Sequence, residues 1–309
     1  MKIVFMGTPE FATHILDRLI KDQHDICLVV TQPDKQVGRK KTMTPSPVKQ
    51  QALQQGLPLF QPTLIKHDYQ KIIDLNPDFI ITAAYGQILP KALLDVVKAI
   101  NVHGSLLPKY RGGAPIQYAL FDGLKQTGVT IMYMAFQMDS GDIIKQGTCA
   151  IEAEDDYQSL SRKLAHLGAN LLSDVLLDID QNKIVRIPQD SSEVTFAYTL
   201  KRTDEYIDFN QTQEQIINRI RGLSPEPGAY TYVNGQMIKL YKAKKSDIIS
   251  SEKPGTVLSL NKQLIIQSKT GAVAVLELQV PGKKKMQIKD FLNGQNIINI
   301  GDVFQKEDI

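Results

Sequence analysis

The N-terminal half of the chain alternates between short apolar runs and longer segments with helical spacing. Apolar runs, typical of buried strands, occupy residues 2–6, 26–31, 58–60, 78–83 and 100–103. Apolar positions at helical spacing predict helices over 10–21, 47–56, 69–75 and 157–180. Strands that alternate with helices indicate an α/β fold, a Rossmann-like, mostly parallel sheet with helices on both faces. Ligands of such sheets bind at the carboxyl ends of the strands.

The pattern changes after the long helix. Two further strands, 130–136 and 143–151, precede that helix, whereas residues 181–210 are polar and mixed. Asn234-Gly235 lies inside an alternating run, which predicts a hairpin over 229–241. A helix over 212–222 and short strands follow the pattern of a small, OB-like β-barrel. We therefore expect three parts: a catalytic domain over 1–183, a linker over 184–207 and a barrel over 208–309.

Composition agrees with a soluble two-domain protein. The chain has 309 residues, of which 42% are hydrophobic and 22% are charged. We expect no signal peptide, since the first residues pass directly into a strand, and no membrane span, since no long apolar run exists. Cys27 and Cys149 lie in strand-like runs and are expected to be buried free thiols, which favours a cytoplasmic protein.

Positive charge is concentrated in the second part of the chain. The whole chain carries +3, but residues 215–300 contain 13 basic and five acidic side chains, a net charge of +8. Such a surface fits a polyanion, and the scarcity of aromatic residues there favours contacts with phosphates over contacts with bases. A basic face that serves only solubility is the alternative. Lys283, Lys284 and Lys285 form the densest cluster.

A second basic segment follows the second predicted strand. Residues 32–44 make a connection longer than such folds need, and Lys35, Arg39, Lys40 and Lys41 give it positive charge. Long loops in compact domains are often functional. A solvated loop without a role is the alternative.

The candidate chemistry lies between residues 101 and 142. Asn101 and His103 are two residues apart on one predicted strand and therefore share a face of it. Asp139 lies in the turn Met138-Asp139-Ser140-Gly141-Asp142, where it could equally be an ordinary turn residue. An amide can stabilise an oxyanion, an imidazole can move a proton and a carboxylate can assist the imidazole. Because no activated nucleophile accompanies them, we predict direct attack of one substrate on another.

Other cofactor chemistry has little support. Gly7-Thr8-Pro9 lies at the first strand-to-helix turn but lacks the glycine pattern of dinucleotide-binding proteins. No cysteine or histidine cluster has the spacing of zinc ligands, so we predict no metal.

The segments 101–117 and 138–142 resemble the folate-dependent formyltransferases. The resemblance extends over nearly the whole chain through Gly7-Thr-Pro, Thr31-Gln-Pro-Asp, Pro45-Ser-Pro-Val-Lys and Ala84-Tyr-Gly-Gln-Ile-Leu-Pro90. It implies 10-formyltetrahydrofolate as formyl donor. The basic loop and the basic second domain favour, as acceptor, the α-amino group of methionine on initiator tRNA. We expect the enzyme to be monomeric. A nucleotide amino sugar is the alternative acceptor, because sugar formyltransferases share the same Asn-His-Asp set.

The resemblance also implies roles for individual residues. Asn101, His103 and Asp139 are the implied catalytic residues. The folate donor is implied to lie along two segments, Tyr85, Gly86, Gln87, Ile88, Leu89 and Pro90, and Ser105, Leu106, Leu107 and Pro108. tRNA contacts are expected from Arg39, Lys40, Lys41, Lys283, Lys284 and Lys285. The chain departs from the pattern at Lys109-Tyr110, where the tRNA enzymes commonly have Arg-Trp, and at Ser224-Pro-Glu-Pro.

Overall fold

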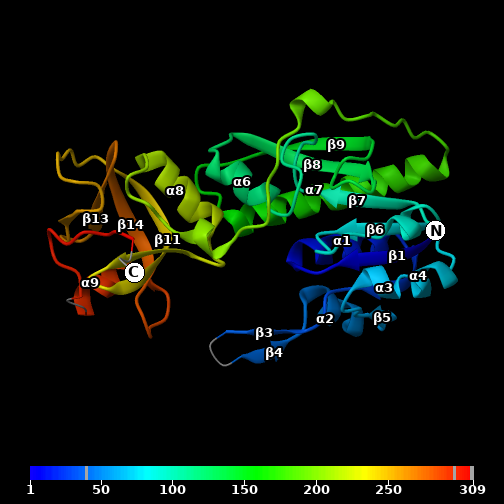
Figure 1. Ribbon diagram of the computed structural model, residues 1–309, viewed down its shortest axis with the longest axis horizontal. Helices are drawn as coiled ribbons and strands as arrows, with labels where there is room; N and C mark the ends of the chain where they lie inside the picture. The colour runs from blue at the N-terminus through cyan, green and yellow to red at the C-terminus, as the bar shows by residue number, and fades with distance from the viewer. Residues whose placement is uncertain (39–40, 295–296, 307–309) are drawn as a thin grey trace. The chain divides into compact units, whose positions relative to one another are not determined.

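A computed structural model describes residues 1–38, 41–294 and 297–306. The chain forms two compact units (Figure 1). The first comprises Met1–Pro115, Gln126–Ala150 and Ser161–Tyr198, and the second Ile116–Lys125, Ile151–Leu160 and Thr199–Ile309. Two segments from within the expected catalytic domain thus belong to the second unit. Residues 184–198 of the expected linker belong to the first unit, and the remainder belongs to the second.

A seven-stranded sheet forms the centre of the first unit. Its strands lie in the order β5 (Leu59–Phe60), β2 (Asp25–Val30), β1 (Lys2–Gly7), β6 (Phe79–Ala83), β7 (Ala99–His103), β8 (Gln126–Tyr133) and β9 (Ile143–Ala150). The first five strands are parallel, and β8 and β9 run antiparallel to their neighbours. The mixed, mostly parallel α/β fold predicted from the sequence is confirmed.

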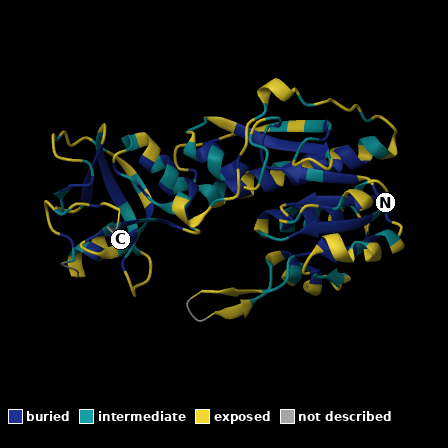
Figure 2. Ribbon diagram, in the orientation of Figure 1, coloured by how far each residue is buried: buried dark blue, intermediate teal, exposed yellow. Residues whose placement is uncertain are grey.

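Helices cover both faces of this sheet. On one face, α1 (Glu10–Lys21) contacts α7 (Tyr157–Asp180), where the Arg18 guanidinium donates to Ser173 Oγ at 2.8 Å. On the other face, Ile65, Ile72 and Leu93 pack on alternate side chains of the strands. They come from the short helices α3 (Ile65–Asp68), α4 (Gln70–Asp74) and α5 (Lys91–Leu94). Strands buried on both faces explain the continuous apolar runs (Figure 2).

The long basic connection contains regular structure that the sequence did not predict. β3 (Lys35–Val37) and β4 (Thr42–Thr44) pair antiparallel as a hairpin, which precedes α2 (Pro47–Gln54). An ion pair of 2.7 Å between Lys49 Nζ and Asp34 Oδ2 lies at its base. Short strands without apolar alternation carry no signal of period two, which is why we expected an irregular loop. Arg39 and Lys40 lie outside the described residues.

An antiparallel sheet forms the second unit. Its order is β10 (Ala229–Val233), β11 (Gln236–Ser246), β14 (Gly271–Gln279), β13 (Leu264–Ser268) and β12 (Val257–Ser259), with β15 (Met286–Gln287) beside β14. Near the C-terminus, Gln305 bridges to Tyr232 and Val303 to Thr256, so one segment joins the two edges. The predicted β-hairpin is confirmed, with φ of +51° at Asn234 and +70° at Gly235.

Helices complete the second unit. Buried side chains of α8 (Gln213–Gly222) and α9 (Ile288–Gly294) join the strands in one apolar core. The short helix α6 (Pro115–Phe121) and α9 were not predicted, since neither shows two full turns of apolar spacing. Two 3₁₀ turns, Ser191–Glu193 and Arg202–Glu205, interrupt the segment after α7.

Candidate active site

β7 places two of the candidate residues side by side. Asn101 and His103 lie on one face of this strand, which pairs with β6 through Thr82 and with β8 through Met132 and Thr130. Asp139 comes from the loop between β8 and β9 and adopts a φ of +50°, which Asp tolerates better than most residues. The structure therefore brings together side chains from two segments that are far apart in the sequence.

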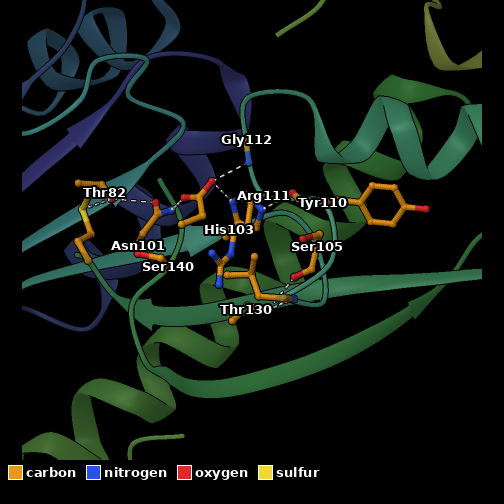
Figure 3. A network of polar contacts seen from close by, with 12 residues as sticks. Thr82, Asn101, His103, Ser105, Tyr110, Arg111, Gly112, Thr130 and Ser140 are labelled. Carbon is orange, nitrogen blue, oxygen red and sulfur yellow. Dashed lines mark hydrogen bonds and ion pairs between the residues drawn. The ribbon is translucent and has the colours of Figure 1, made fainter. Parts of the chain in front are cut away.

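The amide of Asn101 has a fixed orientation. The Thr82 hydroxyl donates to Asn101 Oδ1 at 2.8 Å, and Asn101 Nδ2 donates to Asp139 Oδ1 at 3.4 Å (Figure 3). Because the amide oxygen faces Thr82, the NH₂ group faces the cluster. A donor held in this way needs no reorganisation to meet negative charge that develops on a substrate oxygen.

His103 uses its two ring nitrogens differently. Nε2 lies 3.0 Å from the carbonyl oxygen of Tyr110, and Nδ1 lies 3.7 Å from Asp139 Oδ2. A carbonyl oxygen only accepts, so Nε2 carries a hydrogen and Nδ1 is the nitrogen that can take up a proton. The ring itself is buried, with 5% of its surface exposed. The Tyr110 side chain points away from it (Figure 3).

Asp139 connects both neighbours to a glycine-containing loop. Its Oδ2 accepts a hydrogen bond of 2.8 Å from the main-chain nitrogen of Gly112. Its side chain is 16% exposed. Asp139 thus presents one oxygen to Asn101 and the other to both His103 and Gly112, so that it can stabilise a protonated imidazole.

Gln189 is a positioning residue that the sequence did not indicate. Its Nε2 donates to the carbonyl oxygens of Asp139 and Gly141, each at 2.8 Å. Its Oε1 accepts from the Arg111 guanidinium at 2.7 and 3.0 Å. Gln189 lies in the segment expected to be a linker, where no local pattern marks a residue that holds a loop 50 positions away. Gly112 and Arg111, by contrast, lie within the motif already singled out.

The first segment expected to bind folate is an irregular stretch after β6. Tyr85 and Leu89 are buried, whereas Gly86 and Ile88 are exposed. The Tyr85 carbonyl accepts from Thr8 Oγ1 at 2.9 Å and from Gln32 Nε2 at 3.1 Å. Burial raises the pKa of the Tyr85 phenol to about 12. In the same segment, Gln87 Oε1 accepts a hydrogen bond of 2.8 Å from the main-chain nitrogen of Ile65, and Pro90 directly precedes α5.

The second expected segment lies deeper in the protein. Ser105 is fully buried, and its hydroxyl donates to the Lys109 carbonyl at 2.7 Å. The Leu107 nitrogen donates to Thr130 Oγ1, and its carbonyl accepts from Gln146. Leu106 and Pro108, which flank Leu107, are partly exposed. The hydrogen bonds of Ser105 and Leu107 thus hold the loop after β7 in place. Leu106 and Pro108 are the members of this segment that remain partly exposed.

Of the residues expected to contact tRNA, the four that the structure describes, Lys41, Lys283, Lys284 and Lys285, lie on exposed turns. Lys41 lies in the β3–β4 turn, and Lys283 and Lys284 lie between β14 and β15. Lys285 differs from its neighbours because its Nζ is 3.0 Å from Glu277 Oε2 and 5.2 Å from the centre of the Tyr241 ring. Its charge is therefore partly balanced within its own unit.

Neither a metal centre nor a membrane span is found in the part of the chain that the structure describes. No group of three or more His, Cys, Asp or Glu side chains among these residues is placed to hold an ion. No described helix is long and apolar enough to cross a bilayer.

Comparison with known proteins gives the class of a chain with this fold and this amide–imidazole–carboxylate cluster: it is a formyl transferase. Residues 1–176 match the formyl transferase family, and residues 199–296 match the C-terminal domain of formyl transferases. The methionyl-tRNA formyltransferase of Bacillus mycoides is 47% identical over 300 residues, which cover 95% of this chain and 96% of that protein. The chain belongs to the methionyl-tRNA formyltransferase family.

Two solved structures share the fold at low sequence identity. HypX from Aquifex aeolicus, in complex with tetrahydrofolic acid, has a TM-score of 0.67 and 19% identity. The match covers 94% of this chain, which spans about half of HypX (47%). An N-formyltransferase from Helicobacter canadensis, in complex with folinic acid and dTDP-3-aminofucose, has the same TM-score and identity. That match covers 89% of this chain and 98% of the other.

Proposed function

We propose that the protein transfers the formyl group of 10-formyltetrahydrofolate to the α-amino group of methionyl-tRNA, preferring the initiator, for translation initiation. The observation that carries this proposal is the cluster of Asn101, His103 and Asp139 in a chain 47% identical to a methionyl-tRNA formyltransferase. We further propose that the protein is cytoplasmic, where such a substrate is found, and that it acts as a monomer.

The geometry of the cluster supports direct transfer. 10-Formyltetrahydrofolate supplies the formyl carbon, and the methionine amine forms the new C–N bond as the bond to the folate nitrogen breaks. Asn101 Nδ2 donates to the formyl oxygen as its negative charge develops. His103 Nδ1 takes the proton from the amine, and Asp139 stabilises the imidazolium until that proton passes to the folate nitrogen. The reaction needs no covalent bond to the enzyme.

The stretch after β6 fits a flat, amide-bearing ring. Gly86 has a φ of +88° and no side chain, so a ligand can approach the main chain there closely. Thr8 and Gln32 hold this stretch in place by donating hydrogen bonds to the Tyr85 carbonyl. We propose that Tyr85, Gly86, Gln87, Ile88, Leu89 and Pro90 hold the pterin ring, with Leu106 and Pro108 contacting the donor from the second segment.

A comparison of acceptors tests the proposal. The purified protein is supplied with 10-formyltetrahydrofolate and with initiator methionyl-tRNA, elongator methionyl-tRNA or a nucleotide amino sugar, and formyl transfer is measured. We expect rapid transfer to the initiator, slower transfer to the elongator and none to the sugar. Transfer to the sugar alone would overturn the proposal in favour of the small-molecule acceptor. That alternative has the support of a distant structural relative at 19% identity.

A further inference from the structure

Two aromatic rings lie stacked on the surface of the first unit. Phe196 is 45% exposed and Tyr198 is 59% exposed. Their ring planes differ by 3°, and their centroids are 5.4 Å apart. Single exposed aromatic residues are common on protein surfaces. Two parallel rings two residues apart, both open to solvent, instead form a flat surface that a third ring can extend.

Main-chain hydrogen bonds fix this pair to the loop of residues 110–114, called here the active-site loop. Arg111 donates to the Thr195 carbonyl at 2.9 Å, and its own carbonyl accepts from Ala197 at 2.8 Å. The Ala114 nitrogen donates to the Ala197 carbonyl at 3.0 Å. Ala197, which separates the two aromatic residues in the sequence, is fully buried. The segment is thus extended, and its alternation turns both rings outward.

The same loop carries partners of His103 and Asp139, two of the three candidate catalytic side chains. Tyr110 accepts from His103 through its carbonyl, and Gly112 donates to Asp139 through its nitrogen. The Tyr110 nitrogen in turn donates to Thr195 Oγ1 at 2.9 Å, next to Phe196. The position of the stacked rings is therefore coupled, bond by bond, to the position of the reacting groups.

We infer that Phe196 and Tyr198 form a stacking platform for the unpaired bases at the 3′ end of the acceptor RNA. This inference rests on the proposed function. The 3′-terminal nucleotide carries the methionyl ester, so its base is the one nearest to the reacting amine. Base–aromatic stacking is tolerant of sequence because every base has a π-face. It also accounts for two large exposed rings beside an active site.

A cation near the platform fits the same ligand. Lys109 is exposed and precedes Tyr110 in the loop, and its Nζ lies 3.5 Å from Glu193 Oε2. Both side chains of this pair are 57% exposed. A surface ion pair of this kind is weak, so the lysine can exchange its partner for a backbone phosphate.

Paired substitutions separate ring stacking from apolar volume. Phe196→Leu and Tyr198→Leu remove the ring but keep an apolar side chain, whereas Phe196→Trp and Tyr198→Trp keep a ring. We expect each Leu variant to weaken binding of methionyl-tRNA by roughly 5- to 150-fold, the range for one stacked base. The Trp variants should bind as well as the wild type or better. Folate affinity and Tm should stay constant in all four, which excludes unfolding as the cause.

Removal of the RNA end tests where the platform acts. Uncharged tRNA that lacks its 3′-terminal single-stranded nucleotides should bind the wild type and Tyr198→Leu equally, because the stacked base is absent from both complexes. The weakening in the Leu variants should be the same for initiator and elongator tRNA, which share this end. Leu variants with unchanged tRNA affinity, or a weakening that persists with the truncated tRNA, would overturn the inference. A wild type that binds no tRNA would instead refute the proposed function.

Discussion

His103 and Asp139 face each other at 3.7 Å between Nδ1 and Oδ2, and both are bonded to the main chain of one short loop. His103 contacts the Tyr110 carbonyl and Asp139 contacts the Gly112 nitrogen. The loop thus sets the separation of the two side chains. Since the Tyr110 carbonyl accepts the hydrogen on Nε2, we propose that proton transfer takes place at Nδ1, which lies 3.7 Å from the Asp139 carboxylate.

Replacement of Asn101 by Ala should slow turnover. The substitution removes a donor that Thr82 holds toward the site, and loss of one such donor lowers kcat by about 10²–10³-fold. Affinity for the folate donor should change little, because the donor acts mainly in the transition state. Steady-state formylation and equilibrium folate binding measure the two effects. Near-normal kcat in Asn101→Ala would remove Asn101 from the mechanism.

Replacement of Asp139 by Asn should lower kcat by roughly 10²–10⁴-fold, the usual contribution of an acid–base group. The amide cannot balance the charge of an imidazolium at Nδ1, although it keeps the size of the side chain. Asp142→Asn, in the same loop, is the matched control and should retain activity. If Asp139→Asn retained the rate of the active Asp142→Asn control over the whole pH range, Asp139 would be only a turn residue.

The lysines between β14 and β15 should contribute unequally to tRNA binding. Replacing Lys283, Lys284 and Lys285 by Ala should weaken binding and flatten its salt dependence, by about 0.9 in slope for each phosphate that is no longer neutralised. Lys285 already pairs with Glu277, so Lys285→Ala alone should change the slope least. Binding measured across a series of salt concentrations distinguishes the variants. An unchanged slope in the triple variant would place the RNA surface elsewhere.

Arg39→Ala should damage formylation of methionyl-tRNA and leave binding of the folate donor intact. The guanidinium is a planar fork suited to phosphates and base edges, and Arg39 belongs to a connection longer than the fold requires. We expect a smaller preference for initiator over elongator tRNA in the variant. Kinetics with both tRNAs check this, and equal behaviour of variant and wild type would exclude Arg39 from recognition.

The histidine pair between α1 and α7 should make the first unit sensitive to acid. Burial, and then the neighbouring His166 ring at 4.5 Å, lower the pKa of His14 below 6.5. The unfolded chain therefore binds more protons at this position as the pH falls below about 6.5. Stability should fall with pH through this window. Tm measured across mildly acidic pH should decline less in His14→Gln than in the wild type, with the exposed His67→Gln as control; equal declines would contradict the assignment.

The sequence by itself determined the order of the main strands and helices and singled out the candidate reacting groups. Apolar runs and helical spacing located β1, α1, β6 and α7, because burial of strands and of one helix face leaves a periodic pattern. The period of two placed Asn101 and His103 on one face of β7. The local turn chemistry of Asn234-Gly235 located the β10–β11 hairpin for a similar reason.

Only the tertiary structure decided how those groups are held. Thr82 orients the amide of Asn101 from a neighbouring strand, and Gln189 fixes the Asp139 loop from a segment without regular pattern. The stacked pair of Phe196 and Tyr198 lies beside the active-site loop through the same kind of pairing. Hydrogen bonds between segments far apart in the chain impose no period on either segment. They become visible only when folding brings the two segments together.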